Sequence, residues 1–227
     1  MIAEAIEKVR ARIAEACSRA GRSPNTITLM AVTKGRSIKE VQEAISCGVT
    51  EIGESRVQEA VKKYEFFESS ESDLHWHLVG HLQTNKVKEA VGIFDLIHSV
   101  DSLRLACEIE RQAAKINKLQ QILIEIKTSP EPTKQGIPAQ ELKPFLEGLA
   151  GFTHIKVRGL MTIAPLVSSA QQTRPYFRAV RLLADEINSQ GVYPRLEILS
   201  MGMSSDFEVA IEEGATLIRL GRVIFEG

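Results

Sequence analysis

Apolar residues in this chain occur at two spacings, as short continuous runs and as stripes that recur every three or four positions. The first stripe, from Ile2 to Ala20, predicts an amphipathic helix that ends at Gly21. Runs of apolar and β-branched residues then predict eight buried strands, at 27–33, 50–53, 74–80, 94–98, 119–127, 155–162, 196–199 and 216–220. Stripes between these runs predict helices near 38–47, from 56, and at 83–91, 102–117, 141–149, 177–190 and 205–213. Asp101 is the expected cap of the helix at 102–117.

This alternation of strands and helices predicts one α/β domain over residues 1–227, a single (β/α)8 TIM barrel with a leading N-terminal helix. No shift in composition marks a linker, and no internal repeat is evident. An open, doubly wound sheet is the alternative. No G-x-G-x-x-G sequence follows the first predicted strand to favour it.

The stretch from Leu196 to Gly227 holds two strands that each finish in a polar loop. Ser200 to Ser204 follows the first strand, and Ser205 with Glu208 has the spacing of a capping box at the start of the next helix. The second strand ends at Arg219 and Leu220 and runs into Gly221. Free backbone N–H groups and hydroxyls in two neighbouring loops form a plausible phosphate cradle. The alternative is an ordinary βαβ corner whose serines cap a helix and whose arginine forms an ion pair.

Charge and composition exclude several classes of partner. With 28 basic and 29 acidic residues, the net charge of -1 gives no electrostatic basis for binding nucleic acid or an anionic membrane. No apolar run reaches transmembrane length, and the opening residues lack the apolar segment of a signal peptide, so we expect a cytoplasmic protein. The three cysteines are far apart and have no metal-binding spacing, which suits a reducing compartment.

In a barrel of this kind the active mouth lies at the carboxyl ends of the strands, with phosphate commonly bound after strands seven and eight. The residues at these ends are Lys34, Glu54, Ser55, Gly80, His81, Ser99, Met161, 200–204 and 219–222. Lys34 follows strand one, which neighbours strand eight in a closed barrel. A lysine beside a phosphate cradle suits a phosphorylated aldehyde, because a primary amine condenses with an aldehyde to an imine.

Other assignments of these residues remain open at this point. From the residues alone, the simpler interpretation of Lys34 is a strand end that enters solvent. Lys127 and Lys134 are competing amines, the latter in the Pro-rich loop TSPEPTKQGIP. His75 and His77 share one strand face but lack a third metal ligand, so hydrogen-bonded core histidines are the simpler interpretation. Paired-carboxylate hydrolysis by Glu54 and Asp101 has no supporting spacing, and a serine triad lacks G-x-S-x-G.

Eight motifs in order resemble a known family. They are AVTK from Ala31, GESRVQE from Gly53, WHLVGHLQTNK from Trp76, HSVD from His98, TKQGI from Thr133, VRGLMTIAP from Val157, LSMGMSSDFEVAIEEGAT from Leu199 and IRLG from Ile218. Together they resemble the pyridoxal-phosphate homeostasis proteins, the YggS/PROSC family, which are similar to the N-terminal barrel of alanine racemase. The resemblance spans nearly the whole chain.

The resemblance implies a barrel that binds pyridoxal 5′-phosphate as an imine on Lys34. By the same match Ser200, Ser204, Gly221 and Arg222 lie around the phosphate, and Arg219 faces the pyridine nitrogen. The predicted cofactor-binding residues are Lys34, Ser55, His77, Met161, Ser200, Met201, Ser204, Arg219, Gly221 and Arg222. Three positions depart from the family pattern: Ser55 stands in place of asparagine, His81 in place of proline, and Arg222 in place of threonine or serine.

The function implied by the resemblance is carriage of the cofactor rather than turnover. An arginine at the pyridine nitrogen weakens the cofactor as an electron sink. The chain also ends after the last predicted strand, without the β-domain that supplies the opposite base in alanine racemase. We therefore expect a monomeric protein that buffers pyridoxal phosphate and delivers it to apoenzymes that require it. A pyridoxal-dependent amino-acid racemase, and a barrel enzyme that binds phosphate metabolites non-covalently, are the alternatives.

Overall fold

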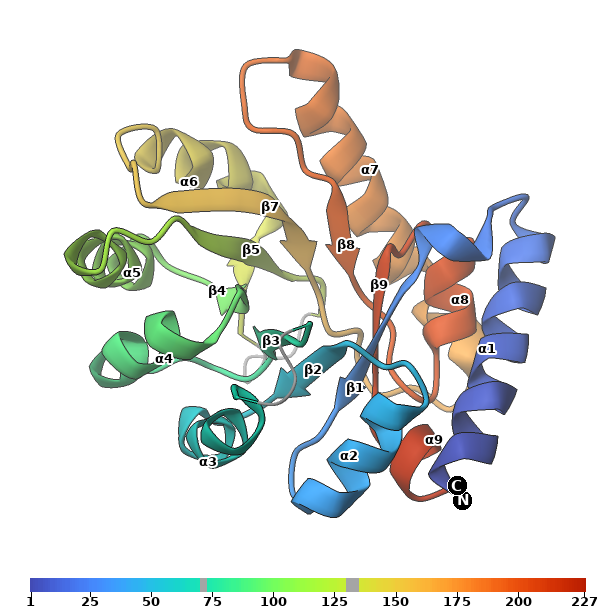
Figure 1. Cartoon of the computed structure of the whole chain (residues 1–227). Coiled ribbons are helices and arrows are strands. Elements are labelled where there is room, and N and C mark those ends of the chain that lie inside the picture. Colours follow the sequence, from blue (N-terminus) through green and yellow to red (C-terminus); the bar gives the residue numbers. More distant parts are fainter. Residues whose placement is uncertain (70–72, 130–134) are drawn as a thin grey trace.

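The computed structural model describes residues 1–69, 73–129 and 135–227, and within them eight parallel strands close into a barrel. Neighbours pair in the order β4-β3-β2-β1-β9-β8-β7-β5, and a further pairing of β4 with β5 closes the ring (Figure 1). The strands are β1 Thr28–Val32, β2 Glu51–Glu54, β3 His75–Leu78, β4 Leu96–Val100, β5 Gln120–Lys127, β7 Ile155–Met161, β8 Ile198–Ser200 and β9 Leu217–Leu220. A two-residue strand, β6 Ile137–Pro138, pairs with β5. This closed topology confirms the predicted (β/α)8 barrel.

Helices connect successive strands and surround the sheet (Figure 1). They are α1 Ile2–Arg19, α2 Ile38–Ser46, α3 Val57–Phe67, α4 Val87–Ile93, α5 Leu103–Lys115, α6 Leu142–Gly148, α7 Arg174–Gln190, α8 Phe207–Glu212 and α9 Arg222–Phe225. Single turns of 3₁₀ helix lie at Pro24–Thr26, Thr84–Lys86, Ala139–Glu141 and Ala170–Thr173. The leading helix α1 packs against α2, α8 and α9, so both ends of the described chain meet on one side of the barrel.

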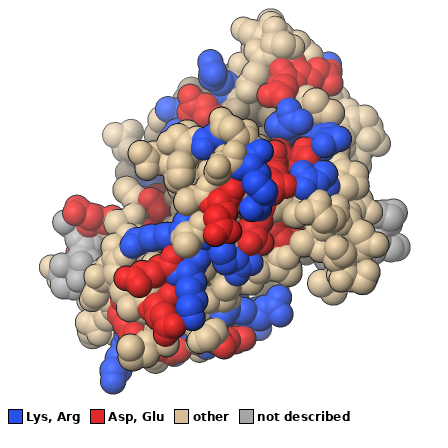
Figure 2. Space-filling view, turned by 90° about the vertical axis from the view of Figure 1, so that its right-hand side faces the viewer, with Lys and Arg blue, Asp and Glu red and all other residues tan. Residues whose placement is uncertain are grey.

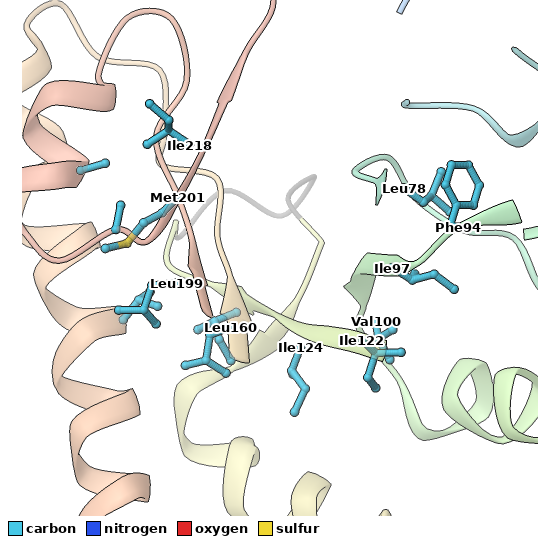
Figure 3. Packing of buried hydrophobic residues seen from close by; sticks show 14 of the residues in the cluster. Leu78, Phe94, Ile97, Val100, Ile122, Ile124, Leu160, Leu199, Met201 and Ile218 are labelled. Carbon is cyan, nitrogen blue, oxygen red and sulfur yellow. The ribbon is translucent and has the colours of Figure 1, made fainter. Parts of the chain in front are cut away.

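Most apolar residues are buried in the layer between the strands and the helices. In Figure 3, Leu78, Phe94, Ile97, Ile122 and Ile124 lie on one side of the barrel. The same figure shows Leu160, Leu199, Met201 and Ile218 on the side of β7, β8 and β9. Each such side chain contributes about 1.5–3 kcal/mol when it is fully removed from water. Because these residues alternate along their strands with residues that face inward, the same strands also build the barrel interior.

The barrel interior is only partly apolar. Leu96, Leu123 and Met161 form a small cluster that is separate from the main core. Polar side chains of β3, β4, β8 and β9 occupy the remaining space, namely His77, His98, Ser200 and Arg219. Gly159 is required here because a Cβ at this position would lie 1.9 Å from the carbonyl oxygen of Ile198 on the neighbouring strand.

Ion pairs join the outer helices on one side of the molecule. Figure 2 shows basic and acidic side chains intermixed on this face. The pairs are Arg12–Glu208, Arg19–Glu212, Arg174–Glu212, Arg174–Glu213 and Arg178–Glu213. Since several of these charges share partners across α1, α7 and α8, they act as a network rather than as isolated surface pairs. No helix in the described ranges is both long and apolar enough to cross a membrane.

Two helix caps differ from the sequence-based expectation. Ser102, and not Asp101, caps α5 by accepting a hydrogen bond from the amide of Leu105, while Asp101 lies 3.8 Å from His81. The capping box of Ser205 and Glu208 is also absent from the described structure. Asp206 is the residue that precedes α8, and Glu208 pairs with Arg12 instead. Short-range spacing predicted these two caps wrongly for two reasons. The neighbouring Ser102 binds the free amide at the start of α5, and Arg12 of the distant helix α1 binds the Glu208 carboxylate.

Candidate functional site

A cavity of about 450 Å³ opens at the carboxyl ends of the barrel strands. It lies where β1, β2, β3 and β9 end, together with the loops that follow β7 and β8. Its lining residues are Val32, Lys34, Arg36, Ser55, Val79, Ile163, Met203, Ser204, Arg219, Gly221, Arg222 and Glu226. The volume is within the range of a small-molecule site, and apolar walls combined with a few charged groups are typical of one.

The amine of Lys34 stands at the edge of this cavity. Lys34 is exposed, and within the described part of the chain its Nζ has no hydrogen-bond or ion-pair partner. The preceding residue, Thr33, is fully buried and donates from its amide to the carbonyl oxygen of Gly53, at 2.9 Å. The backbone that carries Lys34 is therefore fixed, whereas the amine itself is free to react.

A buried ion pair behind the cavity holds the ends of β1 and β2 together. Lys63 of α3 donates to Glu54 Oε1 at 2.5 Å and to the carbonyl oxygen of Thr33 at 2.6 Å. The hydroxyl of Thr33 donates to the same carboxylate oxygen, at 2.6 Å. Thr33 directly precedes Lys34, and Glu54 directly precedes Ser55. This cluster therefore fixes the position of the backbone at both cavity residues.

Ser55 is placed by close contact between two strand ends. A Cβ at Gly80 would lie 2.1 Å from the carbonyl oxygen of Ser55, so only glycine allows the loop after β3 to approach the loop after β2. Ser99 of β4 donates to the carbonyl oxygen of Gly80 at 2.6 Å. The side chain of Ser55 lines the cavity on the side of β2.

Arg219 forms the floor of the cavity. Its Nη1 donates to the carbonyl oxygen and to the hydroxyl of Ser200, at 2.6 and 2.8 Å, and its Nη2 donates to the carbonyl oxygen of Thr162, at 2.9 Å. Burial lowers the pKa of Arg219 to about 10, an effect that Asp206 and Glu125 oppose. The guanidinium is thus held rigidly and stays charged at neutral pH.

The loops after β8 and β9 present backbone groups to the cavity. Gly202 adopts a φ of +94°, which favours glycine, and Asp206 accepts from the amide of Met203 at 2.7 Å, which fixes the turn. Ser204 accepts from the amide of Val223, at 3.3 Å, so the two loops are linked. In the described ranges, no protein acceptor is bonded to the amides of Ser204 and Gly221. Free amides next to the exposed Arg222 suit an anionic group.

The structure brings together six of the ten residues predicted from the sequence, since Lys34, Ser55, Ser204, Arg219, Gly221 and Arg222 all line the cavity. The other four lie below or behind it. Ser200 and His77 are buried in the barrel interior, Met161 belongs to the interior apolar cluster, and Met201 packs in the outer core. Lys127 is not among the lining residues, and Lys134 lies outside the described residues.

Sequence reasoning missed several residues that shape the cavity. Val79 and Ile163 supply apolar walls, and Arg36 pairs with Glu226 at the rim. Met203 also lines the cavity, within the loop 200–204 that the sequence placed at the mouth. Inward-facing parity along the strands could have found Val79, which is two residues beyond His77. The contacts of Arg36 join positions 190 residues apart and have no local signal.

Glu125 on β5 is a further buried acid near this end of the barrel. Desolvation, reinforced by the negative charge of Asp101, raises the pKa of Glu125 to about 7, although Arg219 opposes the shift. The alternation with Leu123 places it on the inward face of the strand. Its protonation therefore changes in the neutral range, within the field of Arg219.

A second hollow in the described structure, of about 770 Å³, lies at the opposite end of the barrel. It is lined by Arg22, Arg181 and Arg195 together with Asp185, Glu197 and Glu212. Its charges balance one another, and it lacks a free amine. Within the described residues, no group of three or more metal-ligating side chains is present.

Comparison with known proteins places this geometry in context. Residues 5–227 match the family model described as alanine racemase, N-terminal domain. The chain is 45% identical over 222 residues to a pyridoxal phosphate homeostasis protein of Aquifex aeolicus, a match that covers 98% of this chain and 96% of that protein. A pyridoxal phosphate homeostasis protein of Escherichia coli K12 is 37% identical over 227 residues, with 99% and 95% covered.

Solved structures give the same relationship. PipY of Synechococcus elongatus PCC7942, with PLP bound, has a TM-score of 0.88 at 37% identity, over 99% of this chain and 100% of that chain. An alanine racemase of Clostridium difficile 630 has a TM-score of 0.67 at 15% identity, over 94% of this chain and 54% of the racemase. The second likeness shows the fold alone.

Proposed function

We propose that this chain, which belongs to the family of pyridoxal phosphate homeostasis proteins, binds pyridoxal 5′-phosphate at its barrel mouth and takes part in the homeostasis of that cofactor. The names of its relatives and the PLP-bound structure of PipY support this proposal. The observation that carries it here is one cavity that combines a free amine, a buried guanidinium and two loops with free amides. These three features match the aldehyde, the ring and the phosphate of the cofactor.

We further propose that Lys34 holds the cofactor covalently, as a reversible imine. The amine has no competing partner in the described residues, and the fixed backbone at Thr33 keeps it at the cavity edge. Ser204, Gly221 and Arg222 would hold the phosphate, with Ser200 beneath them. When bound, the cofactor supplies a reactive carbonyl and an aromatic ring, and the protein's own residues orient it and separate it from bulk water.

The surroundings of Arg219 favour storage over turnover. A guanidinium disfavours protonation of a pyridine nitrogen that it faces, and an unprotonated ring is a weaker electron sink. Glu226, a carboxylate at the cavity rim, is already paired with Arg36. We therefore propose that the chain acts as a monomeric carrier that holds the reactive aldehyde and releases it to apoenzymes.

Absorbance spectroscopy tests this proposal. Adding pyridoxal 5′-phosphate to the wild-type chain should give the visible band of an imine, and Lys34→Ala should abolish that band. Lys39→Ala, an exposed lysine of α2, is the matched control and should retain it. An unchanged band in Lys34→Ala would contradict the assignment of the amine.

Proton exchange separates a carrier from a racemase. The loaded chain should exchange the α-proton of alanine in heavy water no faster than free pyridoxal 5′-phosphate does. Exchange well above that rate, lost in Lys34→Ala, would establish turnover and overturn the carrier proposal.

A further inference from the structure

A continuous row of polar side chains crosses the barrel interior from β2 to β9. The successive distances are 2.5 Å from Glu51 Oε2 to His77 Nε2, 2.9 Å from His77 Nδ1 to His98 Nε2, 2.9 Å from His98 Nδ1 to Ser200 Oγ and 2.8 Å from Ser200 Oγ to Arg219 Nη1. Each link joins neighbouring or facing strands of the closed sheet. We refer to these five residues as the interior chain.

The members of the interior chain are removed from water. His98 and Ser200 are fully buried, and His77 and Arg219 are 4% and 5% exposed. Only Glu51, at the amino end of β2, is partly exposed. Buried polar groups without partners are unfavourable, so each link of the interior chain constrains the orientation of the next.

The direction of each hydrogen bond follows from the chemistry of the two ends. A guanidinium can only donate, so Ser200 Oγ accepts from Arg219 and directs its own proton to His98 Nδ1. Burial, together with the electrostatic effect of the neighbouring His77 ring and of the Arg219 guanidinium, lowers the pKa of His98 well below its usual range, which keeps this imidazole neutral. His98 then donates from Nε2 to His77 Nδ1, and His77 donates from Nε2 to the Glu51 carboxylate. Every hydrogen bond of the interior chain is thus donated in the direction that leads from Arg219 to Glu51.

We propose that His98 is a positioning residue for Arg219: through Ser200, it orients the guanidinium toward the bound cofactor ring. His77, together with Glu51, holds the imidazole of His98 in place. This inference rests on the proposed function, in which Arg219 faces the ring of the bound cofactor. The backbone carbonyls of Ser200 and Thr162 fix where the guanidinium lies. His98 fixes the hydroxyl of Ser200 as an acceptor toward Arg219 and keeps a second positive charge away from it.

The first test uses the protein without cofactor. Nitrogen-15 NMR of the histidine rings should show His98 as the neutral tautomer protonated at Nε2, unchanged between about pH 5.5 and 8. A His98 ring protonated at Nδ1, or one that titrates within this interval, would overturn the proposal. This result does not depend on cofactor binding, so it stands or falls separately from the proposed function.

The second test measures cofactor binding by His98 variants. His98→Phe removes both ring nitrogens at similar volume, and His98→Gln retains a group that can accept from Ser200 and donate to His77. We expect His98→Phe to bind pyridoxal 5′-phosphate roughly tenfold more weakly, with a shifted pH midpoint of the imine absorbance. His98→Gln should remain within about threefold of the wild type, and Leu123→Met, a neighbouring interior residue, should behave as the wild type.

The outcomes distinguish the two proposals. A wild-type affinity and pH midpoint in His98→Phe would overturn the positioning role, while the imine at Lys34 would persist. If His98→Phe does not fold, failure of the folded His98→Gln to retain the wild-type midpoint would contradict the proposal. Absence of an imine band in the wild type itself would reject the proposed function, and the NMR result would still test the interior chain.

Discussion

Individual side chains decide how firmly the cavity can hold an anion, and Arg222 is an exposed cation among them. It lines the cavity beside Gly221, at a position where the family pattern is expected to have threonine or serine. Arg222→Thr should weaken binding of pyridoxal 5′-phosphate roughly tenfold, because a charge-assisted contact to the phosphate is lost. Titration of the imine band measures the change.

Arg195→Thr is the control for this substitution, because Arg195 lines the hollow at the other end of the barrel. Binding that becomes much tighter in Arg222→Thr would show that Arg222 does not replace the missing hydroxyl contact.

Glu125 makes stability depend on pH. Its pKa is about 7 in the folded chain against an ordinary value of 4.5, so the folded state holds a proton that the unfolded state has released between these values. The free energy of unfolding should therefore fall as pH rises through this window. Glu125→Gln should be more stable than the wild type by about 1–3 kcal/mol at pH 8 and nearly equal at pH 4.

Urea unfolding at the two pH values measures this difference, with Glu141→Gln on the exposed surface as the control. An equal effect of Glu125→Gln at both pH values would contradict a titrating, buried carboxyl.

At this scale the sequence identified the residues at strand ends but not the contacts that join residues inside the barrel. Lys34, Ser204 and Arg219 were predicted to share a site because they follow strands that meet at one edge. His98 and Glu125 were not assigned roles, because their significance depends on partners 102 and 94 residues away, Ser200 and Arg219. Strands that are buried on both faces carry no clear alternation to reveal such inward positions.

Among the elements, helix α3 has a specific task in addition to covering β2 and β3. Its Lys63 is buried against Glu54 and the carbonyl oxygen of Thr33. Lys63→Met should lower the free energy of unfolding by about 3–5 kcal/mol, because it leaves the Glu54 carboxylate buried without its countercharge. Urea unfolding at neutral pH measures the loss.

Two further variants sharpen this prediction. Lys62→Met, the exposed neighbour on α3, should be nearly neutral. The double variant Lys63→Met with Glu54→Leu should recover most of the lost stability, since an apolar pair can replace a buried ion pair. A double variant as unstable as Lys63→Met alone would show that packing, and not the charge, was lost.

The elements themselves followed from apolar periodicity, whereas their ends did not. All eight barrel strands lie within or near their predicted ranges, but β3 ends at Leu78 rather than Gly80, and α4 begins at Val87 after a 3₁₀ turn. The cap of α8 was predicted wrongly because Glu208 is drawn to Arg12 on a helix 196 residues away in sequence. End positions depend on such tertiary competitors.

Over the whole molecule, the order of strands and helices was sufficient to predict a closed barrel. Closure itself rests on the pairing of β4 with β5, which shifts register between Ile97 and Val100 and has no signature in the sequence. The polar interior chain depends on that closure, because His98 of β4 reaches Ser200 of β8 across the closed sheet. The ion-pair network of the helices in Figure 2 likewise joins residues far apart in the sequence. Together they place a rigid guanidinium beneath a free amine at one end of the barrel.

The central claim is that this amine, Lys34, carries the cofactor, and reductive trapping tests it most directly. The loaded wild-type chain is treated with borohydride, digested and analysed by mass spectrometry. We predict that the stable pyridoxyl adduct is on the peptide that contains Lys34, and that Lys34→Ala gives no adduct above background. An adduct on Lys127 or Lys134, with Lys34 unmodified, would contradict the account.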